Sequence, residues 1–216
     1  MLLLTIITKE QEGRKQFFPS FYFFSFLPAL SYKFFNSVNS DSDYYLCPML
    51  VYLTGFMGSG KSTYGVELAE ELGYAFIDLD AEISEITGMS VIEIFEKKGE
   101  DYFREKEAEA LLKTFNMKNT IVATGGGAPC HYANMEKMNE HGITIYLKLF
   151  ENELYNRLLQ DLNTRPRLKG KTPDEVMDFV FKTLRERAVF YHQAQIVIYP
   201  PMMPANELAK MLNSGQ

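Results

Sequence analysis

The nine residues GFMGSGKST, Gly55–Thr63, decide the fold class of this chain. They follow a short apolar segment, Leu50–Thr54, and precede a segment whose pattern predicts a helix from about Ser62 to Leu72. Glycines in such a strand-to-helix turn let backbone N–H groups point at phosphate oxygens, and the start of the helix favours the same anion. Lys61 adds a positive charge, and the Ser62 hydroxyl is a ligand for Mg²⁺. The stretch therefore predicts a nucleotide-binding phosphate loop, the alternative being a glycine-rich turn that binds nothing.

Strands and helices are expected to alternate on the C-terminal side of this loop. Further strands are predicted at Ala75–Asp78, Thr120–Thr124, Ile143–Lys148 and Gln195–Tyr199. Helices are predicted at about 81–87, 91–98, 101–116, 131–140, 151–161 and 173–193, with a short one at the end. Apolar strands that alternate with amphipathic helices indicate a parallel sheet covered on both faces. We predict a three-layer α/β/α fold with five parallel strands.

Composition limits the class of partner. Of the 216 residues, 46% are hydrophobic and 23% are charged, which is typical of a globular protein with a real core. The net charge of −6 argues against a nucleic-acid partner, which would require a basic surface. The two cysteines, Cys47 and Cys130, form no CxxC pair, and we expect reduced thiols in a cytoplasmic protein.

The first 48 residues differ from the remainder. They contain eight of the 17 phenylalanines and end in the linker-like stretch NSVNSDSD at 36–43. Their longest apolar segment, Phe17–Leu30, contains two prolines and is shorter than the roughly 18–20 residues that span a bilayer. We expect an N-terminal extension, 1–48, that is disordered, or that is not physiological because translation starts at Met49, followed by one domain, 49–216. Targeting or membrane tethering through 17–30 is the competing interpretation.

Polar side chains lie at the ends of the expected strands, where open α/β sheets bind their ligands. Asp78 and Asp80 come at the end of the second strand, and the alternation of a strand would make them point the same way. Arg104 lies near the start of a charged helix, and Gly125–Gly127 follows the third strand. Further arginines follow at Arg165, Arg167 and Arg187.

Taken together, these segments resemble the shikimate kinase family over residues 49 to about 212. The resemblance rests on six segments in the family's order: GFMGSGKST, FIDLD (76–80), FREKE (103–107), TGGGA (124–128), TRP (164–166) and RERAVFY (185–191). It implies a P-loop kinase fold with a helical substrate-binding insertion after the second strand and a mobile lid at about 159–172. It also implies the transfer of a phosphoryl group from ATP, with Mg²⁺, to the 3-hydroxyl of shikimate in aromatic amino acid biosynthesis, by a protein expected to be a monomer.

The resemblance implies a role for each matching residue. Lys61, Asp80 and Arg165 would be catalytic, with Asp80 either the base or a group that orients the acceptor hydroxyl. Nucleotide contacts are implied for Gly58, Ser59, Gly60, Lys61, Ser62, Thr63, Arg157 and Arg165, with the Pro204 region also against the adenine. Acceptor contacts are implied for Asp80, Arg104, Gly125, Gly126, Gly127 and Arg187, and Mg²⁺ contacts for Ser62 and Asp78.

The chemistry agrees with this set, because an acceptor with one carboxylate and several hydroxyls suits planar guanidinium groups and a carboxylate. Each residue also has a simpler interpretation: Asp78 and Asp80 as helix caps, Arg104 and Arg187 as members of solvated charged faces. One residue departs from the family pattern, since Arg167 stands where an aliphatic residue usually follows the lid Arg-Pro pair.

Two other classes remain open. A gluconate or nucleoside kinase would share the phosphate loop but not the whole set from FIDLD to TGGGA. A catalytically silent nucleotide-binding module would have lost Lys61, Asp80 or Arg165, all of which are present.

Overall fold

The computed structural model describes residues 4–6, 49–162, 165 and 167–214. Its strands are β1 (Leu4–Ile6), β2 (Leu50–Thr54), β3 (Ala75–Asp78), β4 (Thr120–Ala123), β5 (Ile143–Leu147) and β6 (Ile196–Ile198). Its helices are α2 (Lys61–Leu72), α3 (Leu79–Thr87), α4 (Val91–Lys97), α5 (Glu100–Thr114), the short η1 (Ala128–Cys130), α6 (Asn134–His141), α7 (Glu151–Gln160), α8 (Pro173–Tyr191) and α9 (Ala205–Ser214). The predicted α/β alternation is confirmed, with element ends that move by at most about three residues.

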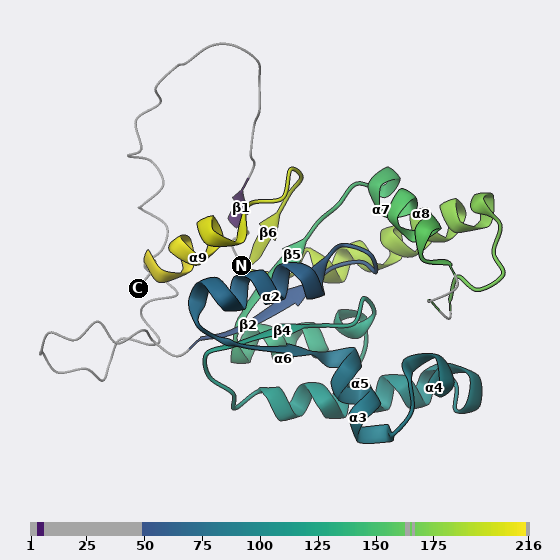
Figure 1. Cartoon of the computed structure of the whole chain (residues 1–216), viewed down its shortest axis with the longest axis horizontal. Coiled ribbons are helices and arrows are strands. Elements are labelled where there is room, and N and C mark those ends of the chain that lie inside the picture. Colours follow the sequence, from purple (N-terminus) through teal and green to yellow (C-terminus); the bar gives the residue numbers. More distant parts are fainter. Residues whose placement is uncertain (1–3, 7–48, 163–164, 166, 215–216) are drawn as a thin grey trace, which may run out of the picture.

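The strands form one parallel sheet in the order β1-β6-β5-β2-β4-β3 (Figure 1). The five predicted strands are all present, and β2, which leads into the phosphate loop, lies between β5 and β4. The sheet contains one strand more than predicted, because β1 pairs with β6 at the edge. β1 belongs to the expected extension; the rest of that segment lies outside the described residues, so its expected disorder stays a prediction.

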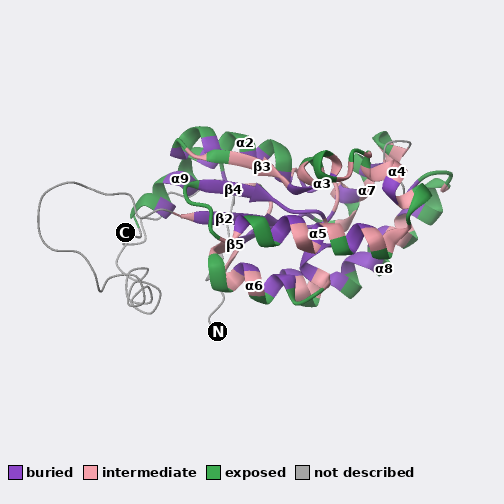
Figure 2. Ribbon diagram, turned by 90° about the horizontal axis from the view of Figure 1, so that it is seen from below, coloured by how far each residue is buried: buried purple, intermediate pink, exposed green. Residues whose placement is uncertain are grey.

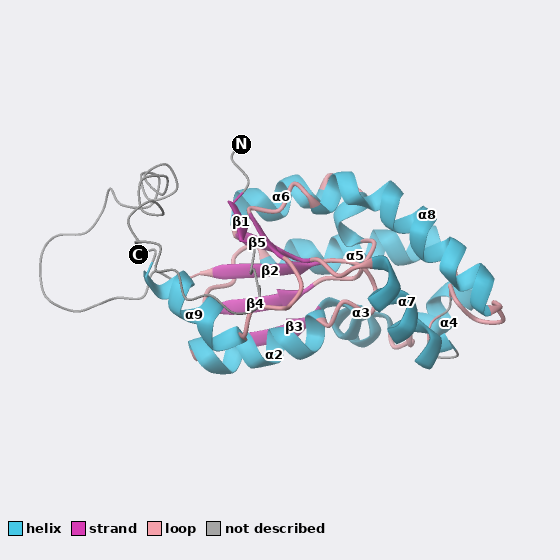
Figure 3. Cartoon of the chain, turned by 90° about the horizontal axis from the view of Figure 1, so that it is seen from above, coloured by secondary structure: helices cyan, strands magenta, loops and turns pink. Residues whose placement is uncertain are grey.

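Helices cover both faces of the sheet (Figure 3). Because side chains alternate along a strand, Val51 and Leu53 of β2 face α2 and α9, while Leu50 and Tyr52 face the opposite layer, which includes α5, α6 and α8. In Figure 2 the central strands are purple, which marks buried residues, and so are stretches of the helices on both sides of the sheet. The three-layer prediction is therefore confirmed.

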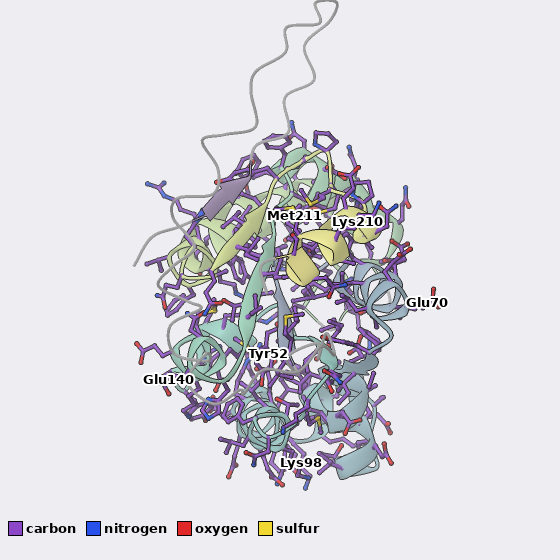
Figure 4. All side chains as sticks on the ribbon, turned by 90° about the vertical axis from the view of Figure 1, so that its left-hand side faces the viewer. Tyr52, Glu70, Lys98, Glu140, Lys210 and Met211 are labelled. Atoms are coloured by element: carbon purple, nitrogen blue, oxygen red, sulfur yellow. The ribbon has the colours of Figure 1, made fainter. Side chains whose placement is uncertain are left out.

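Tyr52 ties the central strand to the layer of α5. The side chain is fully buried, and its hydroxyl shares a 2.8 Å hydrogen bond with Thr114 Oγ1 at the end of α5. Figure 4 shows Tyr52 within the fold, whereas Glu70, Lys98 and Glu140 lie at its outside. Since α5 also carries Arg104, this buried bond helps to fix a candidate site residue against the sheet.

None of the helices in the described part of the chain combines the length and apolar character needed to cross a bilayer.

Candidate active site

One cleft at the carboxyl ends of the strands collects the predicted site residues. Its volume is about 590 Å³. It is lined by Gly58, Gly60, Lys61, Ser62, Thr63, Asp78, Asp80, Arg104, Gly125, Gly126, Gly127, Arg157, Arg165 and Arg187, which is every predicted site residue except Ser59. Ser59 is buried beneath the loop, with Oγ 3.5 Å from Lys61 Nζ. The Pro204 region does not line this cleft.

The phosphate loop has the curled backbone that its glycines predict. Gly58 and Gly60 adopt φ values of 79° and 90°, a region that side chains rarely occupy. Lys61 is the first residue of α2, and its ammonium group donates hydrogen bonds to the carbonyl oxygens of Gly55 (3.0 Å) and Phe56 (2.9 Å). Burial lowers the pKa of Lys61 to about 8, and the neighbouring Asp80 carboxylate opposes that shift. The loop therefore presents a buried cation at the start of a helix, as phosphate binding requires.

Asp78 connects the phosphate loop to the acceptor side of the cleft. Its Oδ2 accepts a 2.6 Å hydrogen bond from the Ser62 hydroxyl, and its Oδ1 accepts one of 3.0 Å from the Asp80 backbone N–H. Asp78 is thus the N-cap of α3, so the interpretation of Asp78 as a helix cap is correct, and its side chain also contacts Ser62. Strand alternation is the wrong reason for Asp78 and Asp80 to point the same way, because α3 begins at Leu79 and places Asp80 in its first turn. Both side chains nevertheless line the same cleft.

Two arginines enter the acceptor side from different helices. Arg104 of α5 is 6% exposed and Arg187 of α8 is 7% exposed, so the alternative of solvated charged faces is wrong for both. Arg187 donates to the carbonyl oxygen of Gly126 at 2.8 Å, and the Tyr191 hydroxyl donates to the same oxygen. Arg104 lies beside Gly127, where an added Cβ would be 2.5 Å from its Nη2. The two guanidinium groups therefore meet at the glycine triplet.

Glu107 is a site residue that the sequence analysis missed. It is fully buried one turn after Arg104, and its Oε2 accepts a 2.6 Å hydrogen bond from Arg104 Nη1. Burial raises the pKa of Glu107 to about 7, and Arg104 opposes the shift. The available signal was the spacing Glu100, Arg104, Glu107, which places three charges on one side of a helix.

Two buried carboxylate oxygens face the space above Gly125. Oδ1 of Asp80 and Oε1 of Glu107 accept no hydrogen bond from any residue that the structure describes. An added Cβ at Gly125 would lie 3.1 Å and 2.4 Å from these atoms, so only glycine leaves both carboxylates in place. Burial raises the pKa of Asp80, with a further contribution from Asp78, while Lys61 and Arg104 oppose the shift. Unpaired buried acceptors of this kind suit the hydroxyl groups of a ligand.

Arg157 and Arg165 lie on the nucleotide side. Arg157 Nη1 donates to the carbonyl oxygen of Gly58 at 3.1 Å, and Arg157 also pairs with Glu153 on its own helix. Arg165 pairs with Asp161 at 3.7 Å, and its Nε is buried with no hydrogen bond to the described residues. Both side chains line the same cleft as Lys61.

The expected lid, 159–172, includes 163–164 and 166, which lie outside the described residues. Within this segment, Leu168 is fully buried in the main core cluster. Leu168 therefore anchors the loop, while Arg165 and Arg167 line the cleft.

The charge of the cleft is opposite to that of the chain. Six basic side chains line it against four acidic ones, although the chain as a whole carries −6. A second hollow of about 570 Å³, between the end of β5 and α8, contains none of the predicted site residues. The cleft is basic, it lies above a phosphate loop, and its far side carries carboxylate oxygens that can accept hydrogen bonds from the hydroxyl groups of a ligand. This combination defines a P-loop kinase of small molecules.

The comparisons with known proteins give the particular family. The family model described as shikimate kinase matches residues 57–211. A shikimate kinase of Bacteroides thetaiotaomicron is 45% identical over 147 residues, which is 68% of this chain and 84% of that protein.

Solved structures agree with this result. A crystal structure of shikimate kinase from Bacteroides thetaiotaomicron superposes with a TM-score of 0.70 at 39% identity, covering 77% of this chain and 97% of that one. Shikimate kinase from Acinetobacter baumannii, solved in complex with shikimate, gives a TM-score of 0.68 at 35% identity over 78% of this chain and 92% of that one. The chain belongs to the shikimate kinase family.

Proposed function

We propose that this chain transfers the γ-phosphoryl group of ATP to the 3-hydroxyl of shikimate, giving shikimate 3-phosphate and ADP in aromatic amino acid biosynthesis. The observation that carries the proposal is the convergence of Arg104 and Arg187 at Gly126 and Gly127, in the cleft that also contains the phosphate loop. Two buried guanidinium groups bind one carboxylate through charge-assisted hydrogen bonds. Shikimate supplies that carboxylate on a ring of hydroxyl groups.

On the acceptor side, Asp80 and Glu107 supply unpaired carboxylate oxygens for the ring hydroxyls. Asp80 holds the hydroxyl that attacks and takes or orients its proton, since a loose transition state requires only late deprotonation. The oxygen of that hydroxyl forms the new bond to the γ-phosphorus, and the bond from the γ-phosphorus to the bridging oxygen breaks. The electron pair of the broken bond leaves with ADP.

On the nucleotide side, the glycine-rich backbone from Gly58 to Gly60 holds the phosphates, together with Thr63 in the first turn of α2. Lys61 turns from the carbonyl oxygens of its own loop toward the β- and γ-phosphates. Arg165 reaches the same phosphates with its unpaired Nε, and Arg157 lies beside the loop, where the base would stack. These groups neutralise charge and position the donor, which is most of what phosphoryl transfer requires.

The residues fit a magnesium ion. Mg²⁺ takes one or two protein oxygens and completes its shell with water and phosphate. The Ser62 hydroxyl and the Asp78 carboxylate provide such a pair, 2.6 Å apart at the phosphate loop, and Asp78 would act through water. When bound, the ion offsets charge on the β- and γ-phosphates.

ADP release by the purified full-length protein tests the reaction. We expect release with ATP, Mg²⁺ and shikimate, and at least about 100-fold less with gluconate or a nucleoside monophosphate as acceptor. Phosphorus NMR of the product identifies the hydroxyl that is phosphorylated. Turnover with gluconate or a nucleotide but not with shikimate would overturn the proposal, and full turnover with EDTA in place of Mg²⁺ would overturn the metal assignment.

The proposal also includes a monomer in the cytoplasm, with neither nucleic acid nor membrane as partner. The net charge of −6 supports the exclusion of nucleic acid. Light scattering on a sizing column tests the monomer, since a mass of about twice 24.9 kDa would contradict it.

A further inference from the structure

Arg167 joins the loop on the nucleotide side to the acceptor side of the cleft. Its Nη2 donates to both carboxylate oxygens of Glu100, at 2.6 Å and 2.5 Å, across 67 residues of sequence. Glu100 is the first residue of α5, the helix that carries Arg104. The side chains of Arg167 and Glu100 are 30% and 35% exposed, so this ion pair is only partly open to solvent.

Glu100 is shared between two arginines. Its Oε1 also accepts hydrogen bonds from Arg104, at 3.1 Å from Nη2 and 3.3 Å from Nε. Glu107 holds the Nη1 of Arg104. Arg104 therefore lies between two carboxylates, and both of them compete with a ligand carboxylate for its charge and its N–H groups.

The charge of Arg167 decides how strong that competition is. Burial works against the ionised form of Glu100, but the hydrogen bonds from Arg167 and Arg104 lower its pKa below the ordinary value. Glu100 is thus ionised, and Arg167 offsets its charge at 2.5 Å. Without Arg167, the whole charge of Glu100 would act on Arg104 and reduce its attraction for an acceptor carboxylate.

The loop does not depend on Arg167 for its position. The next residue, Leu168, is fully buried in the core. Lys169 forms a second ion pair from the same loop, with Glu96 at 2.8 Å, and both of these side chains are more than half exposed. The loop is therefore anchored independently of Arg167.

We propose that Arg167 is a positioning residue for the acceptor carboxylate, and that it acts by sharing Glu100 so that Arg104 stays available to the ligand. Arg167 belongs to the loop that carries Arg165, so this loop contributes residues to both sides of the cleft. This inference rests on the proposed function, in which the acceptor carries a carboxylate.

Arg167→Met in the full-length protein tests the inference, because methionine keeps the apolar stem and removes the charge. We expect the Kd and KM for shikimate to rise about fivefold, with the Kd for ATP and the kcat at saturating shikimate each within about twofold of wild type. Arg167→Lys should recover part of the loss, since it restores the charge without the planar fork. Titration of shikimate by calorimetry, with steady-state kinetics, measures these quantities, and the melting temperature checks folding.

Two further variants separate this role from loop packing. Lys169→Met is the matched control, which removes an ion pair of the same loop, and it should leave shikimate affinity unchanged. In a Glu100→Gln background, Arg167→Met should have no further effect on shikimate affinity, because its partner charge is already gone.

An unchanged shikimate Kd in Arg167→Met would overturn this inference but not the proposed function. So would an equal loss of shikimate affinity from Arg167→Met in the wild-type and Glu100→Gln backgrounds. Failure of the wild-type protein to release ADP with shikimate would instead overturn the proposed function, and this inference with it.

Discussion

The guanidinium group of Arg104 and the carboxylate of Glu107 form a 2.6 Å ion pair that is closed to solvent. The two residues are one turn apart on α5, so a short helical spacing creates the pair. Burial determines how much this pair affects stability, because each charge has lost its hydration and the partner charge has to replace it. The pair also leaves Oε1 of Glu107 unbonded to the described residues and next to Gly125, where a ligand hydroxyl fits.

Glu107→Gln should change how stability depends on pH. The pKa of Glu107 is raised from 4.5 to about 7 in the folded protein. The stability that protonated Glu107 adds to the fold is therefore fully present below about pH 4.5 and is lost as pH rises through about 7. The glutamine does not titrate. The stability of the variant relative to wild type should therefore improve by about 3 kcal/mol between about pH 4.5 and about pH 8.

Urea unfolding at several pH values measures this change. Glu109→Gln is the matched control on the same helix, because the side chain of Glu109 is 44% exposed and its pKa is lowered, so it titrates below this window. If the free energy of unfolding of Glu107→Gln differed from that of wild type by the same amount at every pH, the raised pKa of Glu107 would be contradicted.

Lys61→Ala should lower kcat by about 10²–10³, because it removes the buried positive charge at the transferred phosphate. Lys61→Arg should not restore activity, since the planar fork replaces a compact ammonium group that fits between the carbonyl oxygens of Gly55 and Phe56. Steady-state ADP release measures both variants, and circular dichroism checks their folding. Turnover within tenfold of wild type in Lys61→Ala would show that the loop charge is dispensable.

Asp80→Asn should reduce shikimate-dependent turnover by at least about 100-fold while ATP affinity stays within about twofold. Because burial and Asp78 raise the pKa of Asp80, wild-type kcat/KM should fall on acidification at a higher pH than an ordinary aspartate would give. Glu107→Gln separates the two carboxylates, since it removes the titration of Glu107 and retains that of Asp80. Near-normal turnover of Asp80→Asn would mean that the acceptor hydroxyl lies elsewhere.

Arg104→Ala and Arg187→Ala should each weaken shikimate binding by about 1.5–3 kcal/mol, the effect of losing a charge-assisted hydrogen bond. ATP binding should change much less. The matched control is Arg185→Ala, two residues from Arg187 on the exposed side of α8. Direct titration with shikimate decides the prediction, and an unchanged affinity in both variants would place the carboxylate site elsewhere.

Amide exchange should report closure of the loop from 159 to 172. In its described part, 159–162, 165 and 167–172, we expect exchange to slow when ATP or an unreactive analogue binds, because Arg165 then gains phosphate contacts that exclude water. Leu168→Ala should remove the core anchor and speed exchange in the ligand-free protein. Equal exchange with and without nucleotide would count against a lid.

The sequence alone predicted strands β2 to β6, the longer helices and the phosphate loop, because these depend on short-range rules, but it did not predict β1. Hydrophobic periodicity and glycine positions act over a few residues, so Gly55–Thr63 and the strand that precedes it could be located without a structure. The segments that follow each strand could be predicted as ligand sites for a similar reason, since parallel strands bring their carboxyl ends to one edge.

Tertiary structure decided which charges lie in the cleft and which lie in solvent. The spacing of Glu100, Arg104 and Glu107 groups three charges on one side of α5, but it does not show whether that side is buried. Glu107 is fully buried beside Asp80, whereas the side chain of Glu109 is 44% exposed. The contact between Arg167 and Glu100 joins residues 67 positions apart. Burial and long-range pairing set the charge state of a carboxylate, and both depend on how helices pack against the sheet, which no short window of sequence contains.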